Sequence, residues 1–134
     1  MNEEINYEIE QIHKYLKEIE NMNIESLEEF KNTPIKHLAS SMCIFSILNS
    51  CIELGENLIT KKKLETPLKY KEIFEILRNN NLISKKTGEK LSEYMYIRNM
   101  LAHQYGKINL KKVYEIINSK KIILDFMNEI KNNM

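Results

Sequence analysis

Apolar residues recur at steps of three and four along most of this chain, which is the period of an α-helix. The first stripe extends from Ile5 to Met22 and predicts a helix of about five turns. Ser26 and Glu29 have the spacing of a capping box, which predicts a short helix that ends near Lys31. No alternating pattern typical of strands persists for long, so the sequence predicts an all-α fold.

A long apolar helix is predicted in the middle of the chain. Thr33-Pro34 is typical of a helix start, with threonine as N-cap and proline at the first helical position. Residues 35–63 then carry apolar side chains on more than one face, and only Gly55 interrupts them. A helix with this pattern lies at the centre of a fold, or faces both a core and a partner subunit. Thr66-Pro67 repeats the start signal for a shorter helix that ends in the polar turn 78–81.

Two more helices complete the predicted fold. Ser84 is expected to cap a helix that runs to about His103, and Gly106 is expected to break it. Asn109 is expected to cap the last helix, whose apolar side runs to Ile130. Short loops favour antiparallel neighbours, so the prediction is an antiparallel bundle of four long helices plus one or two short helices.

The length of the chain sets the expected number of domains, and its net charge limits the class of binding partner. Its 134 residues are expected to form a single domain, residues 1–134, which is long enough to bury a core without a disulfide or metal. A net charge of +1 argues against a polybasic protein that coats nucleic acid. The charge is uneven, because residues 1–33 carry −6 and residues 34–134 carry +7. Only Arg78 and Arg98 among the 20 basic residues are arginines.

The cysteines and the N-terminus indicate a reducing compartment. Cys43 and Cys51 lie in the apolar helix and are expected to be small buried thiols rather than a disulfide or ligand pair. The first ten residues lack the layout of a signal peptide, and no run of 18 apolar residues predicts a membrane span. We therefore expect a cytoplasmic protein with no membrane contact and no metal site of the Cys-His type.

Arg98, His103 and Tyr105 form the pattern R-x-x-x-x-H-x-Y, which suits phosphodiester chemistry. Histidine can move protons near neutral pH, and arginine is a permanent cation that binds phosphate through two donors. RNA cleavage without a metal needs a base for the 2′-hydroxyl, an acid for the leaving 5′-oxygen and a cation for the phosphorane charge. One copy supplies one arginine and one histidine, so the pattern favours a homodimer with a shared cleft.

Each residue of the motif also has an ordinary structural interpretation. Arg98 alone is more often a solvated helix residue, and His103 alone is more often a capping or half-buried histidine. Tyr105 alone is more often a packing residue with a solvated hydroxyl. His13 and His37 have no partner at a useful spacing, and we expect both to be structural or exposed. The functional interpretation therefore depends on the spacing of the three motif residues together.

Two groups near the motif are expected to stay outside the site. Tyr94 and Tyr96 are expected in the core or in an interface, with a base-stacking platform as the alternative. Lys61-Lys62-Lys63 is expected to be a solvated helix end, with contact to an RNA backbone as the alternative. Neither group enters the predicted set of site residues.

The motif and its context resemble the HEPN superfamily of ribonucleases, specifically the HepT toxins. The similarity covers residues 5–130, is specific at the motif and is looser elsewhere. The segments that carry it are Pro34-Ile35, Cys51–Leu54 with Leu58-Ile59, Tyr70–Leu77, Arg98-Asn99 with His103, and Val113–Ile117. The chain departs from many members at Glu56-Asn57, where they carry Asn-His, so a role for that histidine is absent or replaced here.

The resemblance implies a homodimeric, metal-independent endoribonuclease that acts as the toxin of a toxin–antitoxin pair. Arg98 and His103 would be the catalytic pair at the dimer interface, and Asn99 would support the site. The implied partner is a minimal nucleotidyltransferase (MntA-like) antitoxin that neutralises the toxin by AMPylation of Tyr105. ATP would be used by that partner, so no cofactor is expected in this chain.

Two rival functions remain open at this point. The first is a catalytically inactive HEPN interaction module that binds a minimal nucleotidyltransferase, which the two-faced apolar helix over residues 35–63 would suit. The second is a nucleotide-binding bundle, which no glycine-rich phosphate loop supports. RNA cleavage by the unmodified protein separates the first rival from a nuclease.

Overall fold

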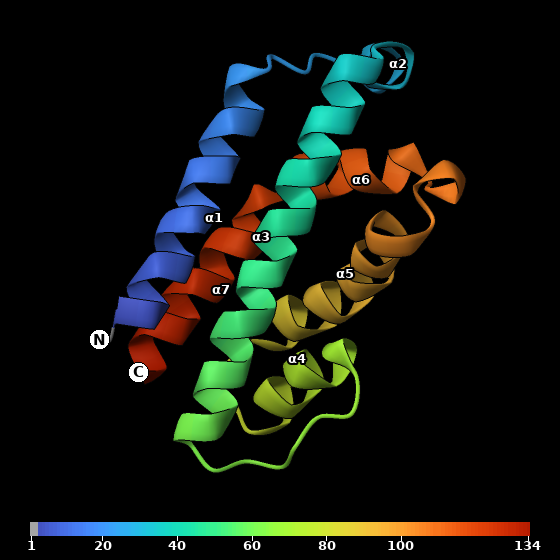
Figure 1. Ribbon diagram of the computed structural model, residues 1–134. Helices are drawn as coiled ribbons and strands as arrows, with labels where there is room; N and C mark the ends of the chain where they lie inside the picture. Colours follow the sequence, from blue (N-terminus) through green and yellow to red (C-terminus); the bar gives the residue numbers. More distant parts are fainter. Residues whose placement is uncertain (1–2) are drawn as a thin grey trace.

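The computed structural model describes residues 3–134, which contain helices and no strand (Figure 1). The elements are α1 (Glu3–Asn21), α2 (Leu27–Asn32), α3 (Pro34–Lys61), α4 (Tyr70–Asn79), α5 (Lys85–His103), the 3₁₀ turn η1 (Tyr105–Lys107), α6 (Leu110–Ile117) and α7 (Lys120–Asn133). The predicted all-α fold is confirmed, and α1, α3, α5 and α7 are its four long helices. Three shorter α-helices accompany them, because the predicted last helix is divided in two.

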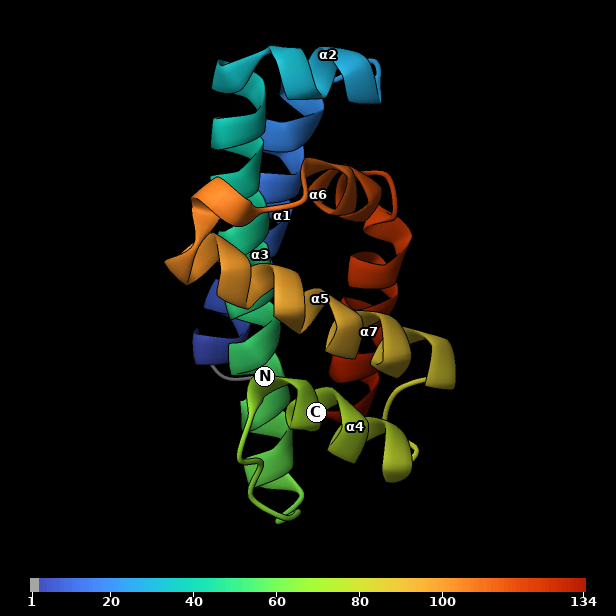
Figure 2. The same cartoon turned by 90° about the vertical axis from the view of Figure 1, so that its right-hand side faces the viewer.

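Helix α3 forms the centre of the bundle. It contacts all six of the other α-helices, with α1 alongside it and α5 crossing it (Figures 1 and 2). Its length and hydropathy alone would let it cross a membrane, but 61% of its most apolar window is buried inside the fold. Cys43 and Cys51 lie on its buried side as free thiols, as predicted, and burial raises the pKa of both.

The prediction of one last helix from Asn109 to Ile130 is wrong, because the chain turns at Asn118 and Ser119. Asn109 does cap α6, since its side chain accepts from the backbone N–H of Lys111. Helix α6 packs against α2, α3 and α5, whereas α7 runs along α3 and α5 in another direction (Figure 2). A straight helix cannot bury both apolar faces against these neighbours, and Asn and Ser accommodate the turn between them.

The short helix α4 begins three residues later than the Thr66-Pro67 signal predicts. Its start is fixed by Glu72, whose Oε1 accepts from the backbone N–H of Leu68 at 2.9 Å. Close packing against α3 also fixes its position, because a Cβ on Gly55 would lie 2.4 Å from Cγ2 of Ile73. Gly55 therefore allows the close approach that places the first turn of α4 beside the C-terminal half of α5.

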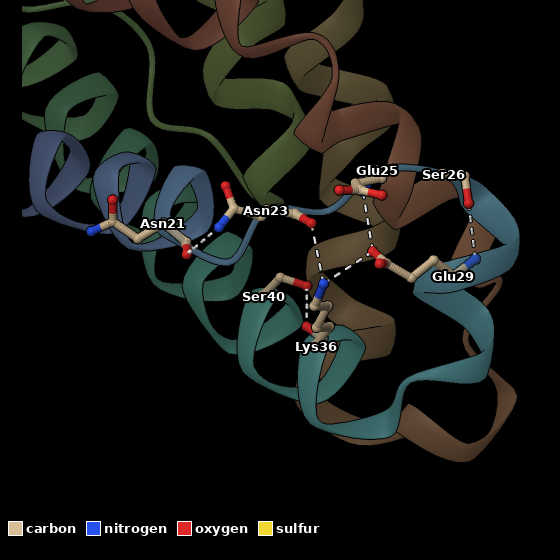
Figure 3. A network of polar contacts seen from close by, with 7 residues as sticks. All are labelled: Asn21, Asn23, Glu25, Ser26, Glu29, Lys36 and Ser40. Carbon is tan, nitrogen blue, oxygen red and sulfur yellow. Dashed lines mark hydrogen bonds and ion pairs between the residues drawn. The ribbon is translucent and has the colours of Figure 1, made fainter.

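A network of polar contacts fixes the corner between α1, α2 and α3 (Figure 3). Ser26 caps α2 as predicted, since its Oγ accepts from the N–H of Glu29 at 3.1 Å. The Glu29 carboxylate accepts from the N–H of Glu25 at 3.1 Å and lies 3.1 Å from Nζ of Lys36. Both contacts lower the pKa of Glu29, that with Glu25 more than that with Lys36. Lys36 also donates to the carbonyl of Asn23 at 3.1 Å. The first turn of α3 is thereby bonded to the connection between α1 and α2 and to α2 itself.

Pro34 occupies the first turn of α3 as predicted, but Thr33 does not cap it through its side chain within residues 3–134. Thr33 instead contributes its carbonyl, which accepts from the N–H groups of Lys36 and His37 at 2.9 and 3.1 Å. The start of the helix therefore depends on the fixed φ of proline and on the corner network.

Candidate active site

Arg98 is held between two aromatic rings on the surface of the bundle. Its Cζ lies 5.1 Å from the ring centroid of Phe45 on α3 and 4.7 Å from that of Tyr70 on α4. Its Nε donates to Oδ1 of Asn49 at 2.8 Å, and Nη1 donates to Oδ1 of Asn99 at 3.2 Å. Three helices thus fix one guanidinium, which is an oriented cation rather than a solvated side chain.

Arg98, Asn99 and His103 line one groove of about 850 Å³. On a straight helix Arg98 and His103 point about 140° apart, but the groove is wide enough to be bordered by both. The segment before α4 and the first turn of α4 form its other wall and add Lys69 and Lys71. The structure therefore brings the two predicted catalytic residues and the predicted supporting residue to one surface depression.

The groove has a positive balance of charge that suits a phosphate backbone. Arg98, Lys69 and Lys71 line it together with a single carboxylate, that of Glu56. Burial raises the pKa of Glu56, and the charge of Glu53 raises it further. Glu56 stands where the resemblance places an asparagine, so this chain has an acidic group at the edge of the groove.

His103 is the last residue of α5 and is exposed. The N–H of Gln104 closes the helix by donating to the carbonyl of Met100 at 2.8 Å, and the chain then leaves the axis with φ −143° at Gln104. Gly106 does not break the helix as predicted, because it lies beyond its end inside η1 and has no positive φ.

Tyr105 does not line the groove, and its hydroxyl points to α3. Oη lies 2.9 Å from Nδ1 of His37 and 3.4 Å from both Oγ of Ser41 and the carbonyl of His37. The two rings stack with centroids 6.4 Å apart and planes 20° apart. No spacing in the sequence indicates this contact, because the two residues are 68 positions apart, and the structure shows His37 half-buried with Tyr105 as its partner. His13 is exposed, as predicted.

The two tyrosines that precede Arg98 have different surroundings. Tyr94 is buried, as predicted, and this burial raises its pKa. Tyr96 is 68% exposed and lines the groove, so of the two expected positions, core or interface, the structure excludes the core for it. Residues two positions apart on a helix point to different sides, and of these two tyrosines Tyr96 is the one that lines the groove. An exposed aromatic ring in a positive groove can stack on an unpaired base.

Asn49, Phe45 and Tyr70 are the site residues that sequence reasoning missed. They reach Arg98 from other helices, and no local spacing links them to it. In chemical terms the groove offers a fixed cation, an exposed imidazole and an aromatic ring on one surface. A cation beside one group that can donate or accept a proton is part of the set that phosphodiester cleavage needs, which is a base, an acid and a cation.

Comparison with known proteins identifies the family. The HepT-like ribonuclease family matches residues 12–131, and this chain belongs to it. A curated relative, the mRNA nuclease HepT of Shewanella oneidensis, is 26% identical over 68 residues. That alignment spans about half the length of each protein, 51% of this chain and 51% of the relative.

Similarity to solved structures extends over nearly the whole chain. The tri-AMPylated HEPN toxin of Shewanella oneidensis, in complex with its MNT antitoxin, is similar over 98% of this chain and 99% of that one, with a TM-score of 0.89 and 22% identity. A cytosolic protein of unknown function from Bacillus subtilis is similar over 96% and 86%, with a TM-score of 0.81 and 19% identity. The bundle therefore has the fold of the HEPN toxins.

Proposed function

We propose that this protein is a metal-independent endoribonuclease that acts in the cytoplasm as the toxin of a toxin–antitoxin pair. The observation that carries the proposal is the groove in which a fixed Arg98 and an exposed His103 face the same space. Arg98 stabilises the negative charge that develops on the phosphorane, and His103 transfers a proton at the 2′-hydroxyl or the leaving 5′-oxygen. Membership of a ribonuclease family and the similarity to a curated mRNA nuclease support this activity.

The substrate enters the groove as flexible, unpaired RNA. Lys69 and Lys71 attract the phosphate backbone next to Arg98, and the exposed ring of Tyr96 offers a stacking surface for a base. Binding through a few contacts is weak, which suits a nuclease whose net charge is only +1. Asn99 supports the reaction by holding the guanidinium through its side-chain oxygen.

The complete site forms between two copies of the chain. Apolar side chains at Ile35, Leu38 and Met42 are 77%, 51% and 62% exposed and follow one face of α3 at helical spacing. The same face continues to Phe45 and Asn49, which contact Arg98. A second copy seated on this stripe covers the exposed apolar surface and brings its own arginine and histidine toward the first groove.

A nucleotidyltransferase antitoxin neutralises the toxin by AMPylation of Tyr105, with ATP supplied on the partner's side. The similar toxin from Shewanella oneidensis is tri-AMPylated in complex with its MNT antitoxin, which supports this assignment. An AMP group at Tyr105 places a bulky phosphate two residues from His103. That negative charge repels RNA and blocks access to the imidazole.

RNA cleavage in the presence of EDTA tests the activity. The purified protein, free of antitoxin, is expected to cut single-stranded RNA, and His103→Ala is expected to reduce the rate at least about a hundredfold. His13→Ala is the matched control, because His13 is an exposed histidine on α1, and it should cut as fast as the wild type. Equal cleavage by His103→Ala would remove the assigned role of this residue.

The dimer is tested separately by light scattering. A wild-type dimer at micromolar concentration is expected, and Met42→Glu should convert it to a monomer by placing a charge in the apolar stripe. Tyr7→Glu is the control, since Tyr7 is also largely exposed but lies on α1. A wild type that is monomeric yet fully active would contradict the shared site.

A further inference from the structure

The hydroxyl of Tyr105 is paired with an imidazole rather than with solvent. His37 Nδ1 lies 2.9 Å from Oη, and the other two acceptors near Oη, the Ser41 hydroxyl and the His37 carbonyl, lie at 3.4 Å. A phenol has one proton to donate, and the shortest of the three contacts, that with His37 Nδ1, is the one that best fits a hydrogen bond from it. In a neutral imidazole that accepts through Nδ1, the proton resides on Nε2.

His37 is held firmly in this position. It lies in the first turn of α3, and its ring meets the ring of Phe30 edge-on at 6.1 Å. Its sequence neighbour Lys36 is bonded to Glu29 and to the Asn23 carbonyl, which fixes the same turn (Figure 3). An acceptor fixed by packing and by the backbone of its own helix loses little entropy when it acts on its partner.

We propose that His37 is the general base for the adenylylation of Tyr105, so that the toxin itself contributes a catalytic residue to its own modification. This inference rests on the proposed modification of Tyr105. In the reaction Oη attacks the α-phosphorus of ATP, and a new O–P bond forms. The bond from that phosphorus to the departing pyrophosphate breaks and its electron pair leaves with the pyrophosphate, while the phenol proton passes to Nδ1 of His37.

The chemistry explains why such a base is useful. A phenol in water keeps its proton at neutral pH and is then a weak nucleophile. An imidazole within hydrogen-bond distance removes the proton as the new bond forms, which is typically worth about 10² to 10⁴ in rate. The structure thereby separates two histidines, since His103 borders the groove and His37 contacts the reacting oxygen of Tyr105.

The first test measures the initial rate of AMP addition at Tyr105 by mass spectrometry, with the nucleotidyltransferase that pairs with this chain and ATP. His37→Gln retains a polar side chain but cannot take up the proton, and it should lower kcat about a hundredfold with KM for ATP unchanged. His13→Gln makes the same chemical change at an exposed site and should leave the rate as it is. An equal rate in His37→Gln would overturn the role of His37 while leaving the modification intact. No adduct at Tyr105 in the wild type would overturn both.

A second test needs no partner and keeps the inference falsifiable. A benzenesulfonyl fluoride reacts with activated tyrosines, and site-resolved mass spectrometry compares Tyr105 with the more exposed Tyr96 in the same molecule. Tyr105 is expected to label faster than Tyr96 in the wild type, and His37→Gln should slow Tyr105 at least about tenfold without changing Tyr96. Circular dichroism establishes that the variant is folded. Unchanged labelling of Tyr105 in the folded variant would overturn the assignment of His37 as a base.

Discussion

His103 and Tyr105 are two positions apart in the sequence and have opposite surroundings. His103 ends α5, is exposed and borders the groove that contains Arg98. Tyr105 begins η1, is half-buried and directs its hydroxyl to His37 and Ser41 on α3. The turn at Gln104 produces this difference, because the chain leaves the helix axis there.

The comparison shows how one short motif can serve two purposes. The groove side keeps a cation and an imidazole open to a substrate, whereas the tyrosine side keeps its hydroxyl beside a second imidazole. A negative charge added at Tyr105 would be separated from His103 by one residue along the chain, and we expect it to oppose the binding of RNA in the neighbouring groove.

Among the further substitutions that test this comparison, Arg98→Lys on the groove side has the largest expected effect. Lysine keeps the charge but loses the planar guanidinium that stacks on Phe45 and Tyr70, so RNA cleavage should fall about ten- to a hundredfold. The matched control is Arg78→Lys, which changes the other arginine, a residue 3.6 Å from Glu89 and away from the groove. Similar rates for the two variants would mean that the fixed guanidinium has no part in cleavage.

Gly55→Ala should disturb the groove by displacing α4, which forms one of its walls. The new methyl group meets Cγ2 of Ile73, a branched side chain with little freedom, so α4 must move away from α3. Overpacking of this kind costs about 1–3 kcal/mol, which the better helix propensity of alanine offsets by about 1 kcal/mol. Thermal unfolding should therefore show a lower Tm. Gly106→Ala, where the added methyl meets no atom of residues 3–134 within 4 Å, should leave Tm nearly unchanged.

Tyr70→Leu removes one of the two rings that contact Arg98 while keeping an apolar side chain. It tests whether the groove side can be weakened without an effect on Tyr105. A cation–π contact at a partly exposed site contributes about 0.5–1 kcal/mol, so the cleavage rate should fall roughly two- to fivefold. Tyr7→Leu, an exposed tyrosine on α1, is the control. AMP addition at Tyr105 should be unaffected by either change; a loss of modification in Tyr70→Leu would show that the two sides are not separate.

The smallest effect is expected from the corner that supports His37. The pKa of Glu29 is lowered by the N–H of Glu25 and by Lys36, so the charged carboxylate stabilises the folded state above its unfolded pKa, about 4.3. This stabilisation disappears as the pH falls through the lower pKa of the folded state. Glu29→Gln should have a slightly lower Tm than the wild type at pH 7 and an equal Tm near pH 2. A difference that persists at the lower pH would contradict the role of the charge.

The sequence predicts what depends on residues close to one another along the chain. The stripe from Ile5 to Met22, the cap at Ser26 and the cap at Ser84 each lie within one helix and its flanks, and the structure confirms them. The motif was found for the same reason, since Arg98 and His103 share α5. The division at residues 118–119 was missed because packing of two faces on different neighbours, rather than a glycine or proline, produces it.

Contacts between distant segments lie beyond such patterns. Asn49 and Arg98 are 49 positions apart, and His37 and Tyr105 are 68 apart, so only the folded chain brings each pair together. His37 in particular has no spacing that relates it to Tyr105. The spacing of the motif residues indicated them as a site and the resemblance implied their roles, whereas the groove, the aromatic rings around Arg98 and the partner of Tyr105 came from the structure.

One measurement addresses the whole account most directly: the rate of RNA cleavage in EDTA by a single preparation before and after treatment with the paired nucleotidyltransferase and ATP, with Tyr105→Phe treated in parallel. The account predicts that the untreated wild type cuts RNA and that the treated wild type does not, while Tyr105→Phe cuts RNA before and after treatment. An untreated wild type that leaves RNA intact, or a wild type that carries AMP at Tyr105 and cuts at its original rate, would contradict it.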